Sequence, residues 1–194
     1  STLPKREILS GYSEIVKHGL INDTHFFNWL TKNSKELKKL NNKILSHAIY
    51  KSILIKRKYV LSDEKEKLKT VHSRAILNFG HTFGHAIETH MGYGEWLHGE
   101  AVSVGMCLAA DMSESLGWIS SSDSSRVRSL CLQANLPVDL PKEMKAPDYL
   151  EQMKVDKKNV SKSIRLVLLQ KLGEAVIYDC RDETLISEMI VRNQ

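Results

Sequence analysis

His81 and His85 stand four residues apart within residues 74–91, where the spacing of the apolar residues predicts a helix. On a helix, side chains four residues apart project from the same face, and Asn78 lies on that face one turn earlier. This spacing suits two ligands of one metal ion. A pair of histidines at this spacing is weak support by itself, because surface histidines often fall four residues apart by chance.

Two glycines inside the same predicted helix strengthen the case for a functional site. Gly80 and Gly84 each directly precede one of the histidines. A glycine in a helix interior costs about 1 kcal/mol of stability relative to alanine. Two such residues beside two histidines indicate that space next to the backbone is needed there. We therefore expect another chain segment or a ligand to approach this helix closely.

His98 offers a third nitrogen ligand, because it begins the sequence HGE after a turn-rich loop, GYGEW, that can fold it back over His81. A catalytic zinc ion usually takes three nitrogen or oxygen ligands from the protein and leaves one position open. Glu14 is a candidate oxygen ligand, since it lies in a predicted apolar helix beside Lys17. The alternative is an exposed ion pair between Glu14 and Lys17, which would contribute only about 0.2–0.5 kcal/mol.

Helical spacing recurs along most of the chain, whereas patterns typical of strands are confined to two short runs near its end. Pro4 suits the first turn of the first predicted helix, and Gly19 suits its C-terminal stop. We predict a single, mainly α domain over residues 1–194, with several helices and a small β-hairpin near the C-terminus. The predicted helices cover residues 4–17, 24–30, 34–58, 74–91, 98–116, 120–134 and 182–191, and the predicted strands cover residues 163–170 and 174–179.

The composition argues against several classes of protein. No apolar run approaches the roughly 20 residues of a membrane-spanning helix, so we expect no membrane role. The three cysteines lie far apart and form no CxxC pair, which favours a reducing compartment and hence the cytoplasm. The first ten residues lack a signal-peptide pattern and a starting Met. We therefore expect this chain to be part of a longer protein.

The net charge of +5 fits either a nucleic acid or a small anionic substrate. The nucleic-acid hypothesis rests on this charge and on a lysine-rich stretch at residues 32–43. Such stretches are usually solvated surface, and the aromatic residues Phe26, Phe27 and Trp29 fit a helix core better than base stacking. We therefore expect no nucleic-acid partner. Salt-dependent binding to random duplex DNA would revive that hypothesis.

A set of motifs, in this order, resembles the C-terminal domain of the 3-dehydroquinate synthase family. The similarity extends from about Thr2 to Tyr178 and so covers nearly the whole chain. The combination of LNFGHTFGHAIE with a downstream HGE is far more specific than two histidines four apart. The motifs are GYSEIVKHGLI (11–21), RAILNFGHTFGHAIE (74–88), HGEAVSVGM (98–106), MKVDKKN (153–159) and IRLVLL (164–169).

The resemblance assigns roles that spacing alone does not. In this family the first histidine of the HTxGH motif binds metal, so His81 would hold the ion together with His98 and Glu14. His85 would instead contact the substrate and assist proton transfer, which replaces the interpretation of His81 and His85 as a ligand pair. The implied catalytic set is His85, Lys17 and Asn78, and the implied substrate-binding set is Arg74, Lys56, Lys157 and Asn78.

The implied reaction converts 3-deoxy-D-arabino-heptulosonate 7-phosphate to 3-dehydroquinate and phosphate, a step of the shikimate pathway. The metal would be Zn2+ or Co2+, and NAD+ would accept a hydride in the full-length enzyme. In this sequence no strand runs through a glycine-rich turn into a helix, so we expect the NAD-binding domain upstream of Ser1. We expect a homodimeric full-length enzyme, whereas the 194-residue piece alone would bind metal without catalysing the reaction.

One segment departs from the family pattern. Asp63 and Arg74 are eleven residues apart without a glycine between them, so this loop is about four residues longer than in the family. For Lys56, just upstream, a solvated surface position is the alternative to substrate binding.

Related sugar-phosphate cyclases and metal-dependent polyol dehydrogenases are alternative functions. Arg74 argues against them, because a substrate without a carboxylate gives no reason for a guanidinium beside Asn78.

Overall fold

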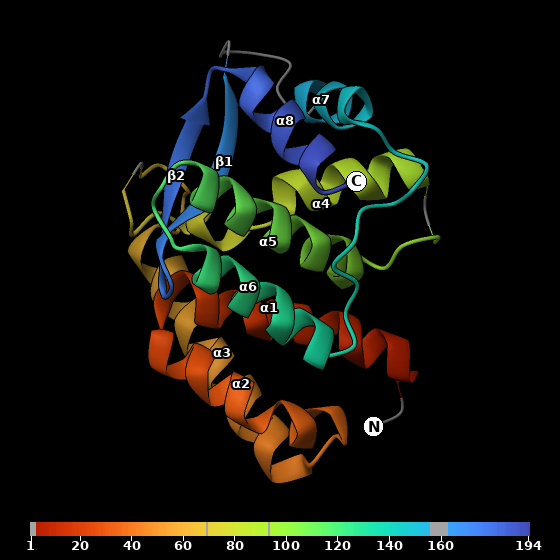
Figure 1. Ribbon diagram of the computed structural model, residues 1–194. Helices are drawn as coiled ribbons and strands as arrows, with labels where there is room; N and C mark the ends of the chain where they lie inside the picture. The colour runs from red at the N-terminus through yellow and green to blue at the C-terminus, as the bar shows by residue number, and fades with distance from the viewer. Residues whose placement is uncertain (1–2, 69, 93, 156–162) are drawn as a thin grey trace.

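The computed structural model describes residues 3–68, 70–92, 94–155 and 163–194. Within these ranges the chain forms eight α-helices, one 3-10 helix and two β-strands (Figure 1). The prediction of a mainly α domain with a small β-hairpin near the C-terminus is confirmed. In chain order the elements are α1 (Lys5–Asn22), α2 (Thr24–Lys38), α3 (Asn42–Ser62), η1 (Arg74–Asn78), α4 (His81–Met91), α5 (His98–Ser115), α6 (Ser121–Gln133), α7 (Ala146–Val155), β1 (Ile164–Lys171), β2 (Glu174–Cys180) and α8 (Glu183–Arg192).

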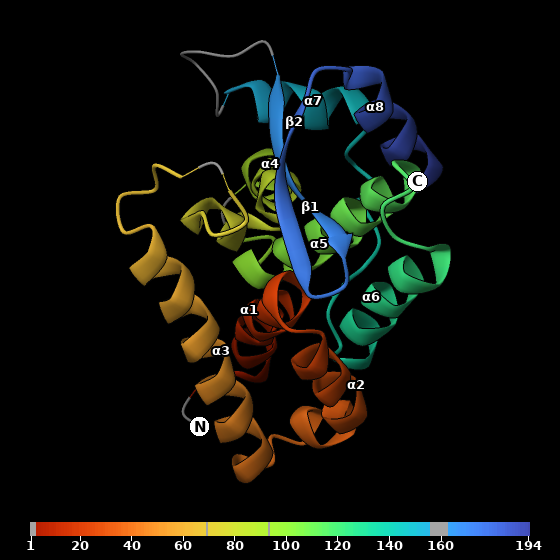
Figure 2. The same ribbon diagram turned by 90° about the vertical axis from the view of Figure 1, so that its left-hand side faces the viewer.

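The helix α5 is the centre of the fold. Every residue from Ala101 to Ser113 is buried, and α5 packs against α4, α1, α6, β1 and α8. A helix that is apolar or small on all sides is stable only where other elements surround it. Figures 1 and 2 show α1, α2 and α3 at one end of the molecule and α7, α8 and the hairpin at the other. The helices α4 and α5 lie between these two groups.

The backbones of α4 and α5 come into direct contact. A Cβ atom on Gly84 would lie 3.1 Å from the Cα of Val102. A Cβ atom on Gly105 would overlap the carbonyl oxygen of Gly80. The expectation that another segment approaches the glycines beside the histidines is therefore confirmed, and that segment is α5.

The predicted helix over residues 74–91 is interrupted, which corrects the expectation for Asn78. Residues 74–78 form the 3-10 helix η1, and α4 begins only at His81. Between them Gly80 has a φ of 79°, in the left-handed region that glycine adopts without steric cost. Asn78 therefore lies outside α4 and does not continue its face.

The first two helices are longer than predicted. α1 continues past Gly19, and α2 continues past the predicted end at Leu30. Asp23 separates the two helices and caps α2, because its carboxylate accepts the N–H of Phe26 at 2.9 Å. Gly19 serves packing instead of termination, since a Cβ atom there would lie only 3.2 Å from the Cα of Phe27.

The prediction of one long helix over residues 34–58 is wrong. These residues are divided between α2 and α3, and Leu40, between them, adopts a φ of 58°. Asn41 then caps α3 by accepting the N–H of Ile44 at 3.3 Å. The apolar spacing on both sides of Leu40 is helical, so the spacing alone joins two helices that the backbone separates.

The C-terminal elements agree with the prediction except for one addition. α5, α6 and α8 lie within one residue of their predicted bounds, whereas α7 was not predicted. The strands pair antiparallel with Ile164 opposite Cys180, as the predicted hairpin requires. The N–H of Leu169 donates to Oγ of Ser113 at 2.9 Å and so fixes the hairpin to α5. Among the described helices, none is long and apolar enough to cross a membrane.

Candidate metal centre

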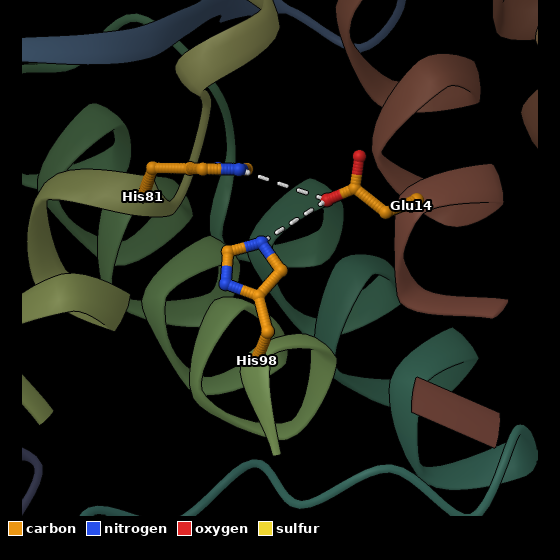
Figure 3. A group of neighbouring side chains, drawn as sticks. All are labelled: Glu14, His81 and His98. Carbon is orange, nitrogen blue, oxygen red and sulfur yellow. Dashed lines mark ion pairs between the residues drawn. The ribbon is translucent and has the colours of Figure 1, made fainter. Parts of the chain in front are cut away.

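Three helices bring one carboxylate and two imidazoles together (Figure 3). Oε1 of Glu14, on α1, lies 3.7 Å from Nε2 of His81 and 3.9 Å from Nε2 of His98. The two histidines are the first residues of α4 and α5. The ligand atoms of this group all lie within 4.8 Å of one another. One carboxylate oxygen with two imidazole nitrogens is a ligand set typical of catalytic zinc, which leaves a further position open.

The packing of α1 on α5 brings Glu14 to His98. The N–H of Gly99, directly after His98, donates to Oγ of Ser10, one turn before Glu14, at 2.9 Å. A Cβ atom on Gly99 would overlap the backbone carbonyl oxygen of Ser10. In the HGE motif, the candidate ligand His98 is thus followed by the glycine that allows α1 to pack closely beside it.

The two oxygens of Glu14 have different surroundings. Oε2 accepts a hydrogen bond from Nζ of Lys17 at 2.7 Å, whereas Oε1 is buried and has no hydrogen-bond partner. A buried polar atom left without a partner costs about 1–3 kcal/mol. Because Oε1 faces the two imidazoles, a cation bound between them would satisfy it. The residues present therefore fit a metal ion.

Lys17 is only 3% exposed, so Glu14 and Lys17 do not form the exposed ion pair considered as an alternative. Burial lowers the pKa of Lys17, and the neighbouring carboxylate opposes this effect. Burial raises the pKa of Glu14, but Lys17, together with His81 and His18, lowers it overall. The buried ammonium therefore keeps Glu14 ionised, which is the state in which a carboxylate binds metal.

The backbone just before α4 orients the ring of His81. Its Nδ1 lies 3.1 Å from the carbonyl oxygen of Phe79, and a carbonyl oxygen only accepts, so Nδ1 carries the proton. Nε2 then presents its lone pair toward Glu14. Burial, followed by the charge of Lys17, lowers the pKa of His81 to about 4. The imidazole is therefore neutral near pH 7, as metal binding requires.

His98 is held by a residue that the sequence did not single out. Its Nδ1 lies 3.1 Å and 3.2 Å from the two carboxylate oxygens of Glu88. Glu88 stands seven residues after His81 on α4, and this two-turn spacing is the one signal that places the two residues on the same face.

His85 lies beside the cluster and is exposed. Its ring centroid is 5.4 Å from that of His81 and 6.0 Å from that of His98. A cavity of about 270 Å³ is lined by His85, Glu88, Thr89 and His98. His85, Glu88 and His98 form a second group with ligand-like spacing. In this second group Glu88 already accepts from His98, whereas the first group contains a carboxylate oxygen without a partner.

The remaining predicted site residues fall into three situations. Arg74 and Asn78 are exposed on η1, which packs against α1 and α3. Lys56 is exposed on α3, and its charge contributes to the lowered pKa of Lys17. Lys157 lies outside the described residues. The structure thus gathers Glu14, Lys17, His81, His85 and His98, and places Arg74, Asn78 and Lys56 on neighbouring elements.

Asp63 closes the long loop that precedes Arg74. Its buried carboxylate accepts the N–H of Lys67 at 2.7 Å, the N–H of Arg74 at 3.1 Å and the hydroxyl of Ser73 at 3.2 Å. Burial raises the pKa of Asp63, but these hydrogen bonds lower it overall. Although the loop is longer than the family pattern, its two ends are thus fastened to each other directly before Arg74.

Comparison with known proteins shows the family of this chain. The family model described as 3-dehydroquinate synthase C-terminal matches residues 11–159. The 3-dehydroquinate synthase of Acinetobacter baumannii (strain SDF) is 45% identical over 194 residues, which are 100% of this chain and 52% of the relative. That of Pseudomonas fluorescens (strain Pf0-1) is 50% identical over 178 residues, which are 92% of this chain and 48% of the relative. The chain therefore spans about half the length of the curated relatives it matches.

Two solved structures share the fold. One is 2-epi-5-epi-valiolone synthase from Streptomyces hygroscopicus subsp. jinggangensis 5008, with NAD+ and Zn2+ bound; its TM-score is 0.83 at 21% identity, over 98% of this chain and 52% of that one. The other is 2-deoxy-scyllo-inosose synthase complexed with carbaglucose-6-phosphate, NAD+ and Co2+; its TM-score is 0.72 at 24% identity, over 100% of this chain and 54% of that one. The family match covers most of the chain and includes all three candidate metal ligands. The chain belongs to the 3-dehydroquinate synthase C-terminal domain family.

Proposed function

We propose that this chain is the metal- and substrate-binding half of a 3-dehydroquinate synthase, which converts 3-deoxy-D-arabino-heptulosonate 7-phosphate to 3-dehydroquinate and phosphate. The observation that carries the proposal is the buried Oε1 of Glu14, which has no hydrogen-bond partner and faces Nε2 of His81 and of His98. The 45–50% identity to synthases of this name supports the choice of reaction.

Glu14, His81 and His98 would hold Zn2+ or Co2+. When bound, the metal supplies a Lewis acid for a substrate oxygen and NAD+ supplies the hydride acceptor. We propose that NAD+ is bound by a further domain of a longer protein, because the relatives are about twice as long as this chain. The two similar structures, which contain NAD+ with Zn2+ or Co2+, support this choice of cofactors.

Lys17 is buried and contacts Glu14, so we propose that it orients this ligand and does not face the position left open for the substrate. It occupies Oε2 of Glu14, so that Oε1 alone points toward the histidines. Its charge favours the ionised form of the carboxylate. We propose that Lys17 is a positioning residue that acts through Glu14, which differs from the direct catalytic role that the family resemblance implies.

His85 is the proposed proton carrier. Its imidazole is exposed at the cavity beside the cluster, where a bound substrate can reach it, and it is not one of the three metal ligands proposed here. An imidazole nitrogen can accept and donate a proton, so this side chain can take up and release a proton during one turnover.

The substrate carries a carboxylate and a phosphate, so fixed cations are needed on both sides of the metal site. We propose that Arg74 and Lys56 supply two of these charges and that Asn78 binds a substrate hydroxyl. Nη1 of Arg74 donates to the carbonyl oxygen of Glu64 at 3.2 Å, which limits the movement of the guanidinium. Lys157 is proposed as a further cation on the strength of the sequence motif alone.

We propose that the full-length enzyme is a cytoplasmic homodimer of the shikimate pathway and that it binds no nucleic acid. The basic stretch at residues 32–43 belongs to the surface of α2 and α3, where most of its lysines are exposed. Exposed lysines of this kind are solvated and need no polyanionic partner.

Turnover by the longer protein that carries this chain tests the proposal. With zinc and NAD+ present, we expect phosphate release from 3-deoxy-D-arabino-heptulosonate 7-phosphate and none from glucose 6-phosphate, which lacks the carboxylate. A chelator should abolish the activity and added zinc should restore it. Turnover of glucose 6-phosphate alone would instead assign the protein to the cyclases that share its fold. Dehydroquinate formation by the 194-residue chain by itself would overturn the two-domain proposal.

A further inference from the structure

Glu88 is not one of the three proposed metal ligands, but it contacts one of them, His98. Both of its oxygens lie within hydrogen-bond distance of Nδ1 of His98, at 3.2 Å and 3.1 Å. An ionised carboxylate can only accept, so this contact requires the proton of the neutral imidazole to be on Nδ1. The lone pair is then on Nε2, the atom that lies 3.9 Å from Oε1 of Glu14.

His81 reaches the same tautomer with a different acceptor. The carbonyl oxygen of Phe79 takes its Nδ1 proton, and Nε2 again faces Glu14. Two imidazoles from two helices therefore present the same nitrogen to one carboxylate oxygen. For His81 the acceptor is part of the backbone, whereas for His98 it is a charged side chain.

The two histidines differ in how firmly packing holds them. The side chain of His81 is 12% exposed, whereas that of His98 is 47% exposed. A half-exposed ring can rotate, which takes Nε2 away from the other ligands, and it can exchange its proton between the two nitrogens, which removes the lone pair from Nε2. Glu88, at 27% exposure, is the neighbour that opposes these movements.

We propose that Glu88 is a positioning residue for metal binding: by accepting the Nδ1 proton of His98, it aims Nε2 of His98 at the metal and makes that nitrogen a stronger donor. This inference rests on the proposed function for the identity of the metal ligands. Hydrogen bonds from ligating histidines to carboxylates have this double effect, and their loss typically weakens metal affinity about 10–100-fold.

A rival role for Glu88 is direct ligation, together with His85 and His98. The geometry favours positioning, because both oxygens of Glu88 lie on the Nδ1 side of His98 at hydrogen-bond distance. A metal bound between Glu88 and Nδ1 of His98 would have to displace the Nδ1 proton that Glu88 accepts. It would also leave Oε1 of Glu14 buried without a partner.

Zinc affinity, measured by competition with a chelator, separates these roles when Glu88→Ala is compared with Glu88→Gln. We expect Glu88→Ala to weaken zinc binding about 10–100-fold. Glu88→Gln retains an oxygen that accepts the Nδ1 proton, so it should recover most of that loss. Equal losses in both variants would overturn positioning in favour of direct ligation, and unchanged affinity in both would overturn any role in metal binding.

The second measurement needs no metal. Imidazole nitrogen NMR of the metal-free chain, at a pH where His98 is neutral, reports which nitrogen carries the proton. We expect Nδ1–H in the unmodified chain and in Glu88→Gln, and a shift toward Nε2–H in Glu88→Ala. An unchanged tautomer in Glu88→Ala would contradict the proposal. If the longer protein fails to form dehydroquinate while this shift is present in the chain, the proposed function fails and the role of Glu88 in orienting His98 stands.

Glu114→Gln is the matched control. Glu114 is a half-buried glutamate on the same helix as His98, sixteen residues further along, and therefore about 24 Å away at the rise of an α-helix. Its substitution should change neither the zinc affinity nor the tautomer of His98. Thermal unfolding of all three variants would verify that each is folded.

Discussion

Gly105 of α5 lies directly against the carbonyl oxygen of Gly80, so that a Cβ atom on Gly105 would overlap this oxygen. Gly80 is the residue before His81, and its left-handed backbone begins α4 at this proposed metal ligand. The contact between these two glycines therefore sets the distance between the helix of His81 and the helix of His98. The relative position of these two proposed metal ligands depends on two residues that have no side chains.

Gly105→Ala should destabilise the chain and weaken zinc binding together. The added methyl group has no space, and overpacking of this kind costs about 1–3 kcal/mol. Relief of the overlap would move α4 away from α5 and His81 with it. Urea unfolding with and without zinc measures both effects, and the stabilisation by zinc should shrink in the variant.

Gly11→Ala is the control for this substitution. Gly11 lies within α1, and no atom lies within 4 Å of the place where its Cβ would be. Alanine is favoured over glycine in a helix interior by about 1 kcal/mol, so this variant should be equally or more stable and should bind zinc normally. A Gly105→Ala protein as stable as Gly11→Ala would contradict the close approach of α4 and α5.

Much of this arrangement could be predicted because its signals are local. The histidines four apart and Gly84 lie on α4, and His98 begins α5, as the helical spacing predicts, whereas Gly80 lies just before α4. The family motifs added the roles of individual residues. Glu14 was found because its helix is apolar and Lys17 follows one turn later.

The features that were not predicted depend on backbone conformations or on contacts across helices. Leu40 adopts a positive φ between α2 and α3, although leucine favours helices and nothing in its side chain indicates a break. The interruption of the helix predicted over residues 74–91 was also missed: residues 74–78 form the 3-10 helix η1, and Gly80 then turns the chain into α4. Glu88 was missed because its partner His98 belongs to the next helix, and sequence spacing does not show which faces of two helices meet.

Glu14→Gln should weaken zinc binding by more than the roughly 100-fold that outer-shell substitutions reach, since it removes the charged ligand itself. It should also lower the free energy of unfolding of the metal-free chain by about 1–3 kcal/mol, because the buried ammonium of Lys17 loses its counter-charge. Chelator competition and urea unfolding measure these two effects separately.

Glu36→Gln provides the comparison for Glu14→Gln. Glu36 pairs with Lys39 at 3.1 Å with the same i,i+3 spacing, but the lysine is 71% exposed. Exposed pairs contribute between about 0 and 1 kcal/mol, so this variant should be nearly as stable as the unmodified chain. Equal destabilisation by both substitutions would show that the buried Glu14–Lys17 pair contributes no more to stability than the exposed Glu36–Lys39 pair.

Acid should destabilise the metal-free chain partly through His18. This residue is buried, and its Nδ1 lies 2.5 Å from Oγ of Ser52. Burial, followed by the charge of Lys17, lowers the pKa of His18 from 6.5 to about 4. Between these two values the unfolded chain binds more protons than the folded chain, so stability is highest above about pH 6.5 and falls as the pH drops toward about 4.

The comparison of His18→Gln with the unmodified chain isolates this effect from the carboxylates that titrate in the same range. The unmodified chain should lose up to about 3 kcal/mol more than the variant between pH 7 and pH 4. His90→Gln, which changes an exposed histidine, should retain the pH dependence of the unmodified chain. Parallel curves for His18→Gln and the unmodified chain would mean that His18 is not held neutral by the fold.

Asp63→Ala should separate substrate binding from metal binding. The carboxylate of Asp63 fastens the loop to the N–H of Arg74, and no atom of this network belongs to the metal cluster. Loss of the contact should let Arg74 move, and misplacement of such a group by about 1 Å can cost up to roughly 100-fold in rate. In the longer enzyme we expect a higher KM for the heptulosonate phosphate with unchanged zinc affinity.

Glu64→Ala, which removes an exposed side chain but retains the backbone carbonyl that Arg74 contacts, should leave KM unchanged. If Asp63→Ala lowered zinc affinity as much as it raised KM, the loop would support the whole site and not Arg74 in particular.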